Sequence, residues 1–360
     1  MNIGIIGVGV IAVGNHIPAY RELGHSVVAL ADNAPGRAEK FARQLSVPDF
    51  YEDYNVLLAR DDIDAVSVCV PTFLHEQVAV DALRAGKHVY LEKPPALDEA
   101  GIFNIYNTAQ ETKRTLLVGS NSIYHPQYKI AKDIVDSGRL GNVYVVKVNR
   151  AQRRDIPNGW MTKKKYTRGF AIMEGVTHNL DGSLYLLGEP RPLAVTCVTY
   201  NMFANYKPLR YGYPMDAVES GQWSGEPKET EDAVLAMVSL EGGCTIMVEA
   251  FRACNAEKMY NVKLYGDKAG MLIDHKRIYW DQKEGGLTLY EEVQHGVLTE
   301  SELDFTNRKW SHTDAIGHFL DCIKTGEQTI SNGKRAVSIM KIVDGMFESA
   351  EQGGRQVMLK

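Results

Sequence analysis

The sequence lacks most features that mark secreted, metal-stabilised or membrane-spanning chains. Its 360 residues include five cysteines, and no two of them stand in a C-x-x-C spacing. An odd, scattered set of thiols argues against a disulfide framework or a cysteine-based zinc site and favours reduced cysteines in a cytoplasmic protein. No segment is long and apolar enough to span a bilayer. We therefore expect a cytoplasmic protein with neither a membrane partner nor a bound metal.

A strong excess of one charge is also missing. The chain has 40 Lys+Arg and 45 Asp+Glu residues, a net charge of −5, which excludes a nucleic-acid binder that relies on bulk positive charge. Residues 2–20 carry no charge, but they lack a basic start and are interrupted by Gly7, Gly9 and Gly14. We interpret them as a strand, a turn and a helix instead of a signal peptide.

The first 120 residues alternate short apolar runs with amphipathic segments. The runs cover residues 3–6, 27–31, 65–70, 88–91 and 116–119. Helical patterns lie between them at residues 11–23, 37–44, 76–85 and 99–111. Continuous apolar strands that alternate with helices are typical of a doubly wound parallel sheet, because helices cover both of its faces. We predict an α/β domain of this kind over residues 1–121.

The pattern changes to separate strands after about residue 141. Strand-like segments cover residues 143–148, 195–200, 234–240, 245–251, 261–264 and 271–274, and a long loop is expected over residues 208–227. Many strands with few helices predict an α+β domain over residues 122–360 with an open, mostly antiparallel sheet. A helical stretch at residues 172–187 would cover one face of that sheet. We expect two C-terminal helices, at 313–324 and 334–351, to be able to pack back on the first domain.

A glycine turn follows the first apolar run. The stretch from Gly7 to Ala12 reads G-x-G-x-x-A, which lets the backbone approach a pyrophosphate at a helix N-terminus. Asp32 ends the second run at the distance where a carboxylate accepts both ribose hydroxyls of an adenosine. That carboxylate would repel a 2′-phosphate and favour NAD over NADP, although Arg37 is near enough to soften the preference. The alternative is a surface aspartate beside a structural turn.

Two further polar stretches follow predicted strands. Pro71–His75 comes after the third run, at the strand end where doubly wound sheets bind ligands. Glu92-Lys93-Pro94 comes after the fourth run, and Pro94 is a candidate for a cis peptide bond. A desolvated Lys93 can act as a base or can polarise an oxygen. The alternatives are a capping or surface histidine at His75 and a solvated Glu–Lys pair.

An acid and a histidine share one face of a predicted helix. Glu174, His178 and Asp181 are spaced i, i+4 and i+7. A carboxylate one turn from an imidazole suits proton transfer, since it can tune the histidine. The same spacing could hold a metal, but no third ligand is obvious. A helical surface without function is the other alternative.

Together these motifs carry a resemblance that extends over nearly the whole chain. The sequence resembles the Gfo/Idh/MocA family of NAD(P)-dependent sugar and polyol oxidoreductases. The matching stretches are the Gly7 turn, Pro71-Thr72-x-x-His75, Ala85–Val89 with Glu92-Lys93-Pro94, Gly119, His125-Pro126, Glu174-x-x-x-His178-x-x-Asp181, Phe319–Ile323 and Ser349–Glu351. The glycine turn occurs in many folds. The Glu-Lys-Pro motif followed by the acid–histidine helix is much more specific.

The resemblance implies a fold and a set of site residues. It implies a Rossmann domain and an open-sheet substrate domain, with Lys93 and His178 acting on the substrate hydroxyl and Glu174 at the acid position. It also implies a homodimer or homotetramer formed through the outer face of the C-terminal sheet. The cofactor candidates are Gly7, Gly9, Val10, Ile11, Asp32, Arg37, Pro71, Thr72, His75, Glu92, Lys93 and Asn121. The substrate candidates are Lys93, Tyr124, Arg153, Trp160, Tyr166 and His178.

Several positions around the substrate depart from the family pattern. Glu174 stands where the family usually has Asp, Ile123 where many members have Arg, and Val176 where Gly is common. Residues 150–168 form a basic, aromatic stretch in which Trp160 could stack on a sugar ring. The lysines at 163–165 fit a solvated loop better than a binding site, and Trp160 could equally pack on the core. These departures leave the identity of the substrate open.

The sequence thus predicts an NAD-dependent dehydrogenase that acts on a secondary alcohol of a sugar, cyclic polyol or sugar derivative. Two alternatives stay open. One is a glycosidase or lyase that uses NAD for transient oxidation, and the other is a cofactor-binding sensor without turnover. The sequence does not name the sugar, the oxidised carbon, the direction, the oligomer size, or which of Lys93 and His178 is the base. NADP is not excluded.

Overall fold

The computed structural model describes residues 1–207, 225–276, 286–294, 296–303 and 312–360. The loop expected at residues 208–227 therefore lies, apart from its last three residues, outside the described part of the chain. The chain divides into two compact units. The described part of the first comprises residues 1–121 and 312–337, and the second comprises the remaining described residues.

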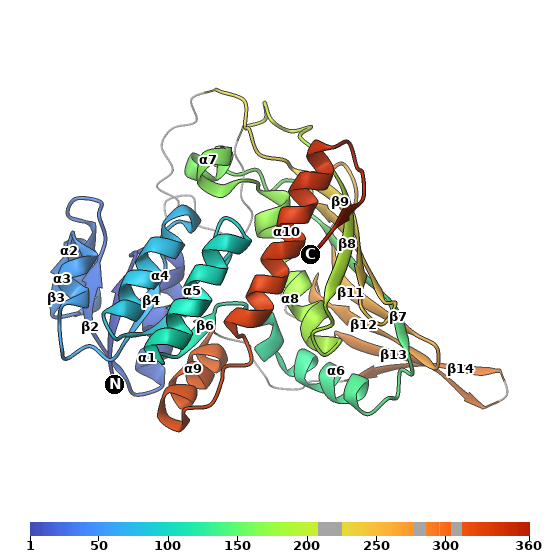
Figure 1. Cartoon of the computed structure of the whole chain (residues 1–360), viewed down its shortest axis with the longest axis horizontal. Coiled ribbons are helices and arrows are strands. Elements are labelled where there is room, and N and C mark those ends of the chain that lie inside the picture. The colour runs from blue at the N-terminus through green and yellow to red at the C-terminus, as the bar shows by residue number, and fades with distance from the viewer. Residues whose placement is uncertain (208–224, 277–285, 295, 304–311) are drawn as a thin grey trace. The chain divides into compact units, whose positions relative to one another are not determined.

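The first unit contains a six-stranded sheet in the order β3-β2-β1-β4-β5-β6 (Figure 1). Its strands are β1 (Asn2–Ile6), β2 (Ser26–Ala31), β3 (Asp49–Tyr51), β4 (Ala65–Val68), β5 (His88–Leu91) and β6 (Leu116–Val118). Every neighbouring pair is parallel. The strand order reverses between β1 and β4, and ligands bind at this switch point in doubly wound sheets. The predicted doubly wound fold is confirmed.

Helices and turns connect these strands. They are η1 (Ala12–His16), α1 (Ile17–Glu22), α2 (Arg37–Leu45), α3 (Tyr54–Leu58), η2 (Thr72–Leu74), α4 (His75–Arg84) and α5 (Glu99–Thr112). From the C-terminal part of the chain, α9 (Thr313–Thr325) belongs to the same unit, and its Phe319 ring meets the Tyr90 ring edge-on at 5.8 Å. All four residues of β4 are buried, as expected for a strand covered on both faces.

The helix predicted at residues 11–23 is divided by a π turn. Residues 12–16 form the π turn η1, closed by a bond from the Ile17 N–H to the Ala12 carbonyl, and α1 follows with Pro18 in its first turn. Pro18 has no N–H, so an uninterrupted α-helix would lose a bond at this position. The wider turn places the proline at a helix start, where its missing donor does no harm.

The second unit contains a nine-stranded sheet in the order β14-β13-β12-β11-β7-β10-β9-β8-β15. Its strands are β7 (Val143–Ala151), β8 (Pro192–Tyr200), β9 (Ala233–Leu240), β10 (Thr245–Phe251), β11 (Met259–Gly266), β12 (Ala269–Asp274), β13 (Leu287–Gln294), β14 (Val297–Leu303) and β15 (Val357–Met358). Only the β7–β10 pair of this sheet is parallel. The predicted open, mostly antiparallel sheet is confirmed.

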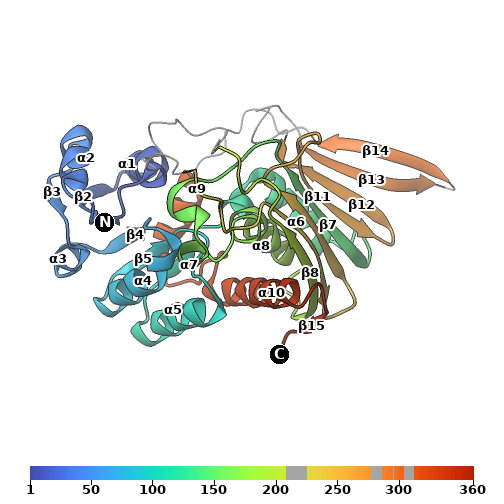
Figure 2. The ribbon, with the colours of Figure 1, turned by 90° about the horizontal axis from the view of Figure 1, so that it is seen from above.

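Helices cover one face of this sheet. The helical segments in this part of the chain are η3 (Asn121–Tyr124), α6 (Pro126–Asp136), η4 (Gly159–Thr162), α7 (Lys164–Thr167), η5 (Ala171–Val176), α8 (Thr177–Leu186) and α10 (Gly333–Glu351). In Figures 1 and 2, α6 and α8 lie along the same side of the strands. The residues that face them alternate with outward-facing ones, as the burial pattern of β10 shows. The other face of the sheet carries no described helix.

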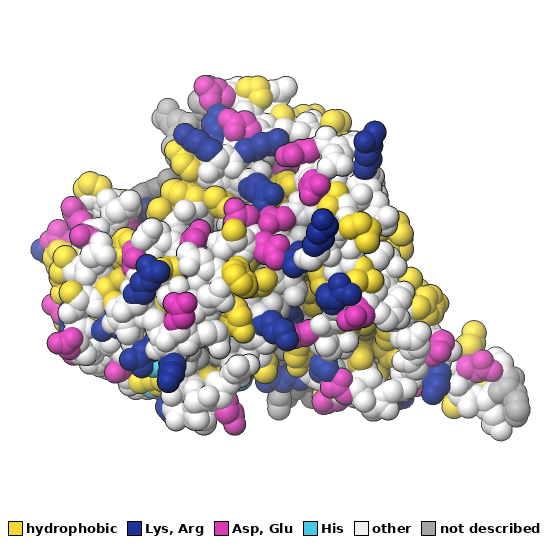
Figure 3. Space-filling model, in the orientation of Figure 1, with side chains coloured by type: hydrophobic (Ala, Val, Ile, Leu, Met, Phe, Trp, Pro, Cys, Tyr) yellow, Lys and Arg dark blue, Asp and Glu magenta, His cyan; other side chains and the backbone are white. Residues whose placement is uncertain are grey.

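Charged side chains of both signs are interspersed on the face drawn in Figure 3, which fits the nearly balanced composition. Within the described residues, no helix is both long and apolar enough to cross a bilayer.

Candidate active site

The glycine turn leaves an open space at the end of β1. Gly7 has a φ of +90°, and a Cβ there would lie 2.6 Å from the carbonyl carbon of Cys69, so no side chain fits. Gly9 differs, since no atom of the described residues lies within 4 Å of its would-be Cβ. Val10 and Ile11 open the helix and are partly exposed. The backbone at the start of this helix can therefore be approached closely by a ligand.

Asp32 follows β2 and braces the glycine turn. Its Oδ2 accepts a hydrogen bond from the Val8 N–H at 2.8 Å, and its Oδ1 accepts one from the Ala34 N–H at 3.0 Å. The Arg37 Nε donates to the Val8 carbonyl at 3.0 Å and lies 3.7 Å from Asp32 Oδ2. A glycine turn without side chains, a helix N-terminus and a carboxylate at the end of β2 together fit a bound NAD.

A buried network connects the same helix to the strand end that precedes Lys93. His16, at the end of η1, is 0% exposed, and its Nε2 donates to Glu92 Oε1 at 2.9 Å. Its Nδ1 lies 2.9 Å from the Ser67 hydroxyl, which lies 2.9 Å from the Tyr20 hydroxyl. The two hydroxyls thus extend the buried hydrogen-bonded network from Glu92 through His16 to Tyr20.

The charges around Glu92 keep it ionised. Burial disfavours its carboxylate, but the hydrogen bond from His16 and the positive charges of His16, His312 and Lys93 outweigh that effect and lower the pKa of Glu92 to about 2. The Glu92 Oε2 also accepts the backbone N–H of Lys93 at 3.2 Å. Glu92 thus holds the start of the Lys93 segment from within the protein.

His75, the first residue of α4, contacts the segment that follows Lys93. The Lys93–Pro94 peptide bond is cis, and the Pro94 carbonyl lies 2.7 Å from His75 Nδ1. The other ring nitrogen of His75 lies 2.8 Å from the Val70 carbonyl. His75 is buried and is therefore not the surface residue that the sequence left open. It fastens the end of β4 to the Glu92-Lys93-Pro94 segment.

The remaining cofactor candidates lie close to these strand ends. Thr72 is buried, and Pro71 and Lys93 are partly exposed. Asn121 is buried, and its Oδ1 accepts a hydrogen bond from the Tyr90 hydroxyl at 2.7 Å. Asn121 therefore has a structural partner within the first unit.

Glu174 and His178 stand out on an otherwise buried segment of the second unit. Between residues 171 and 184, these two are partly exposed and every other residue is buried. Glu174 lies in the π turn η5 and His178 in the first turn of α8, so the expected single helix changes from π to α geometry between them. Asp181 is buried. The described residues contain no group of three His, Cys, Asp or Glu side chains placed to hold a metal ion.

Sequence reasoning missed His275, a buried histidine whose pKa is influenced by the charge of His178. His275, which follows β12, is buried, and its ring stacks on Tyr128 at 5.5 Å. Burial, with added positive charge from His125, Arg150 and His178, lowers the pKa of His275 to about 3. No sequence motif marks His275, because β12 and α6, which carries Tyr128, are far apart along the chain.

The other substrate candidates are dispersed over the second unit. Tyr124 is buried, Arg153 is exposed, and Trp160 and Tyr166 are partly exposed. The Lys165 ammonium lies 4.5 Å from the centre of the Tyr166 ring. Lys163 pairs with Glu226 and Glu229, each at 3.2 Å. These ion pairs agree with a solvated position for Lys163, but Lys164 and Lys165 lie in the helix α7 and not in the expected loop.

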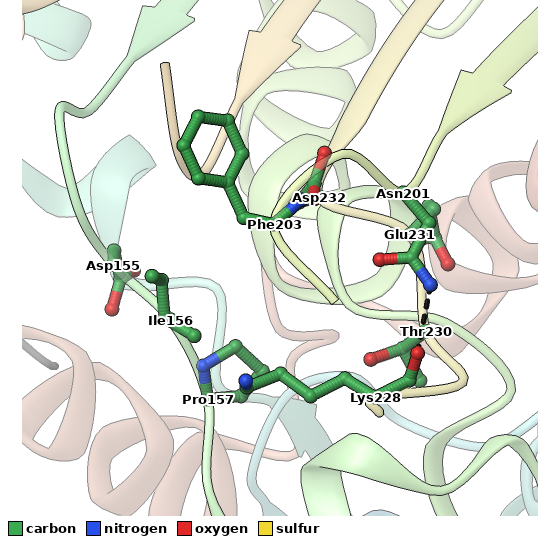
Figure 4. A pocket seen from close by; sticks show the side chains of 9 residues that line it. All are labelled: Asp155, Ile156, Pro157, Asn201, Phe203, Lys228, Thr230, Glu231 and Asp232. Carbon is green, nitrogen blue, oxygen red and sulfur yellow. Dashed lines mark hydrogen bonds between the residues drawn. The ribbon is translucent and has the colours of Figure 1, made fainter. Parts of the chain in front are cut away.

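A small pocket lies beside the start of β9 (Figure 4). It is lined by Asp155, Ile156, Pro157, Asn201, Phe203, Lys228, Thr230, Glu231 and Asp232. None of the substrate candidates is among these residues. Its Glu231 reaches the helical segment that carries Glu174, since its Oε1 accepts the Ile172 N–H at 2.9 Å.

Comparisons with known proteins agree with this arrangement. The profile of an oxidoreductase family with an NAD-binding Rossmann fold matches residues 1–120, and that of the GFO/IDH/MocA C-terminal domain matches residues 128–272. The chain is 26% identical to D-glucoside 3-dehydrogenase of Escherichia coli, over 99% of this chain and 97% of that protein. It is 28% identical to inositol 2-dehydrogenase of Rhizobium meliloti, over 91% and 89% of the two chains.

Solved structures share the fold. Levoglucosan dehydrogenase in complex with NADH and L-sorbose superposes with a TM-score of 0.86 at 21% identity, covering 100% of this chain and 99% of that one. The aldose-aldose oxidoreductase of Caulobacter crescentus gives a TM-score of 0.81 at 22% identity with the same coverage. With both domain profiles matched in order along the chain, this protein belongs to the Gfo/Idh/MocA family of oxidoreductases with an NAD-binding Rossmann fold.

Proposed function

We propose that this protein is an NAD-dependent dehydrogenase that oxidises a secondary alcohol of a cyclic sugar, polyol or sugar derivative. The observation that carries the proposal is that one chain combines a cofactor-type glycine turn with an acid–histidine pair on a buried helical segment. An open glycine turn and Asp32 suit NAD, and a partly exposed acid–histidine pair on a buried helix suits proton transfer. The relatives named for glucoside, levoglucosan and inositol oxidation support the substrate class.

The first unit supplies the cofactor site and one of the groups that act on the hydroxyl. Bound NAD supplies the hydride acceptor. The backbone after Gly7 takes the pyrophosphate, and the Asp32 carboxylate takes the ribose hydroxyls, which favours NAD over NADP. Lys93 hydrogen-bonds the substrate hydroxyl and stabilises the negative charge that develops on its oxygen. Glu92 and His75 hold the backbone on either side of Lys93.

The second unit supplies the proton-transfer pair. His178 accepts or relays the hydroxyl proton, and Glu174 orients the imidazole from one turn away. Trp160 and Tyr166 present aromatic faces to a sugar ring in this proposal, while Tyr124 and Arg153 complete the substrate set. The formal base is either Lys93 or His178. The comparisons name dehydrogenases and give no support to a glycosidase or a sensor.

We also propose a homodimer or homotetramer formed through the uncovered face of the nine-stranded sheet. Directly paired residues lie on one face of a sheet, and Met237 of β9 pairs with Met247 of β10. Their exposed fractions are 52% and 38%, and Tyr265 and Tyr290 share that face. Apolar side chains gathered on an exposed sheet face mark an interaction surface.

The proposal extends to the domain division and the location. We place the cofactor domain at residues 1–121 and the substrate domain at residues 122–360, with C-terminal helices that pack back on the first domain. The break between the two units after residue 121, and the grouping of residues 312–337 with the first unit, support this division. The five cysteines are free thiols, which supports a cytoplasmic location.

Two variants test the assigned roles once a substrate is found. Lys93→Ala should lower kcat by roughly 10²- to 10⁴-fold while the NAD dissociation constant changes little. His178→Ala should also lower kcat by roughly 10²- to 10⁴-fold and should leave the NAD dissociation constant unchanged. Gln110→Ala, at an exposed position of α5, is a control that should leave turnover unchanged. Undiminished turnover in Lys93→Ala would contradict the mechanism.

A further inference from the structure

The helical segment that carries Glu174 and His178 begins without a cap of its own. The residue before η5 is Phe170, which has no side-chain acceptor for the first backbone N–H groups. Free N–H groups at a buried helix start need partners from elsewhere in the protein. The acceptors come from a segment about sixty residues later in the sequence.

Glu231 supplies those acceptors. Its Oε1 accepts the N–H of Ile172 at 2.9 Å, and its own carbonyl accepts the N–H of Ala171 at 3.2 Å. The N–H of Phe170 is also directed at this carboxylate and favours its ionised form. Glu231 itself is only 7% exposed. Glu231 thus accepts hydrogen bonds from two consecutive donors at the start of η5, and its carboxylate also faces the N–H of the residue before them.

Gly169 packs directly against the Glu231 carboxylate. A Cβ at Gly169 would lie 2.4 and 2.6 Å from the two carboxyl oxygens of Glu231, so a larger residue there would displace the carboxylate. The glycine and the glutamate together define where η5 begins.

A positively charged residue, Arg150, binds the C-terminal end of the π turn η5. Arg150, from β7, donates through Nη1 to the carbonyls of Glu174 and Gly175, at 3.1 and 3.4 Å. Its guanidinium lies 4.8 Å from the centre of the Tyr260 ring, which limits its movement. An anion at the start of a helical turn and a cation at its last carbonyls both match the direction of the backbone dipoles.

Burial of the ionised Glu231 carboxylate opposes folding, because the charge loses its water. Loss of water raises the pKa of Glu231 to about 7, although the N–H groups of Ile172 and Phe170 and the charge of Lys164 oppose that rise. A neutral side chain of the same shape would avoid the desolvation of a charge. The carboxylate is kept because its two acceptor oxygens both lie beside donors at the start of η5, and glutamine has only one acceptor oxygen.

We infer that Glu231 is a positioning residue, whose carboxylate fixes the start of η5 and thereby the direction in which Glu174 and His178 face. This inference rests on the proposed function, in which these two side chains handle the proton. Glu231 does not itself touch the reacting atoms.

Glu231→Gln is the decisive variant, and Asp232→Asn is its matched control. Asp232 is the next residue, is also a buried acid, and lines the same pocket (Figure 4). Its Oδ2, however, accepts the N–H of Phe203 instead of a donor of η5. A glutamine at 231 keeps one acceptor oxygen but turns an NH₂ group toward the second donor. Glu231→Ala removes both acceptors.

Two measurements separate this inference from the proposed function. Hydrogen–deuterium exchange without substrate should show the amides of residues 170–172 exchanging at least about fivefold faster in Glu231→Gln than in the wild type and Asp232→Asn. Steady-state kinetics should show kcat reduced roughly 10- to 100-fold in Glu231→Gln, with the KM for the sugar within about twofold.

Equal exchange in Glu231→Gln and the wild type would overturn the inference, as would equal kcat. If the wild type oxidises no sugar, the proposed function fails, and the exchange data alone still decide whether Glu231 holds η5. If Glu231→Ala does not fold, Glu231→Gln decides both measurements.

Discussion

The imidazole Nε2 of His16 donates a 2.9 Å hydrogen bond to Oε1 of Glu92 in the interior of the first unit. His16 ends the π turn that follows the glycine turn, and Glu92 directly precedes Lys93. This contact therefore ties the helix of the proposed cofactor site to the residue proposed to act on the substrate. Both partners are buried, so the pair is shielded from salt and solvent.

Breaking this pair from one side should be destabilising. His16→Ala leaves the Glu92 carboxylate buried without its donor, and we expect the free energy of unfolding to fall by about 3 kcal/mol. The double variant His16→Ala/Glu92→Gln removes the charge as well and should recover part of that loss. Urea denaturation of the two single variants, the double variant and the wild type gives the coupling energy. Additive effects of the two single substitutions would contradict a direct interaction.

The same carboxylate should make stability depend on pH in the acid range. The folded-state pKa of Glu92 is lowered to about 2 from an ordinary value of 4.5. An acid with a depressed pKa contributes stability above its unfolded-state pKa, and this contribution is lost as the pH falls toward the folded-state value. The stability difference between wild type and Glu92→Gln should thus be constant above about pH 5 and shrink between pH 4.5 and pH 2. A difference that does not change with pH would contradict the assignment.

The two glycines of the turn should respond differently to alanine. Gly7→Ala forces a Cβ to within 2.6 Å of the Cys69 backbone at a φ of +90°, and it should lower the free energy of unfolding by about 3 kcal/mol or more. Gly9→Ala meets no atom of the described residues within 4 Å, so the fold should be nearly unaffected. Its methyl group occupies the space proposed for the pyrophosphate and should weaken NAD binding about tenfold. Thermal melts and NAD titration of both variants check this pair, and unchanged NAD affinity in Gly9→Ala would argue against the site.

If the protein assembles through this sheet face, charged substitutions on the face should lower the molecular mass of the particle in solution. Met237→Asp/Met247→Asp places two charges on the exposed face of β9 and β10 and should convert the oligomer to monomers. Phe103→Asp is a matched control, because Phe103 is 51% exposed on α5 of the first unit. Size-exclusion chromatography with light scattering gives the masses. A wild-type monomer, or a double variant with the wild-type mass, would contradict the proposal.

Local patterns were enough to predict the sheets but not the contacts that hold the site. Continuous apolar strands and the glycine turn predicted the doubly wound sheet, and β-branched runs separated by turn signals predicted the strands from β7 to β12. β13 and β14 were missed because most of their residues are exposed, which leaves little alternation to detect.

The buried residues that contact the site segments were missed for a different reason. His16 looks like one polar residue in a helical pattern, and its buried role depends on Ser67 and Glu92, which come from other strands. Glu231 and His275 also act on segments distant in sequence. The π turns η1 and η5 share this property, because side chains outside each turn or a nearby proline decide their geometry. Such contacts are set by the tertiary structure and leave no motif.

The central claim is NAD-dependent oxidation of a sugar or polyol hydroxyl. The most direct test is the absorbance of NADH in mixtures of the purified protein, NAD and a panel of inositols, hexoses, uronic acids and glycosides, repeated with NADP and with Lys93→Ala. Our account predicts NADH formation with a member of the panel, slower reaction with NADP because of Asp32, and loss of the signal in Lys93→Ala. No reduced cofactor with any of these compounds, or equal rates in Lys93→Ala, would contradict it.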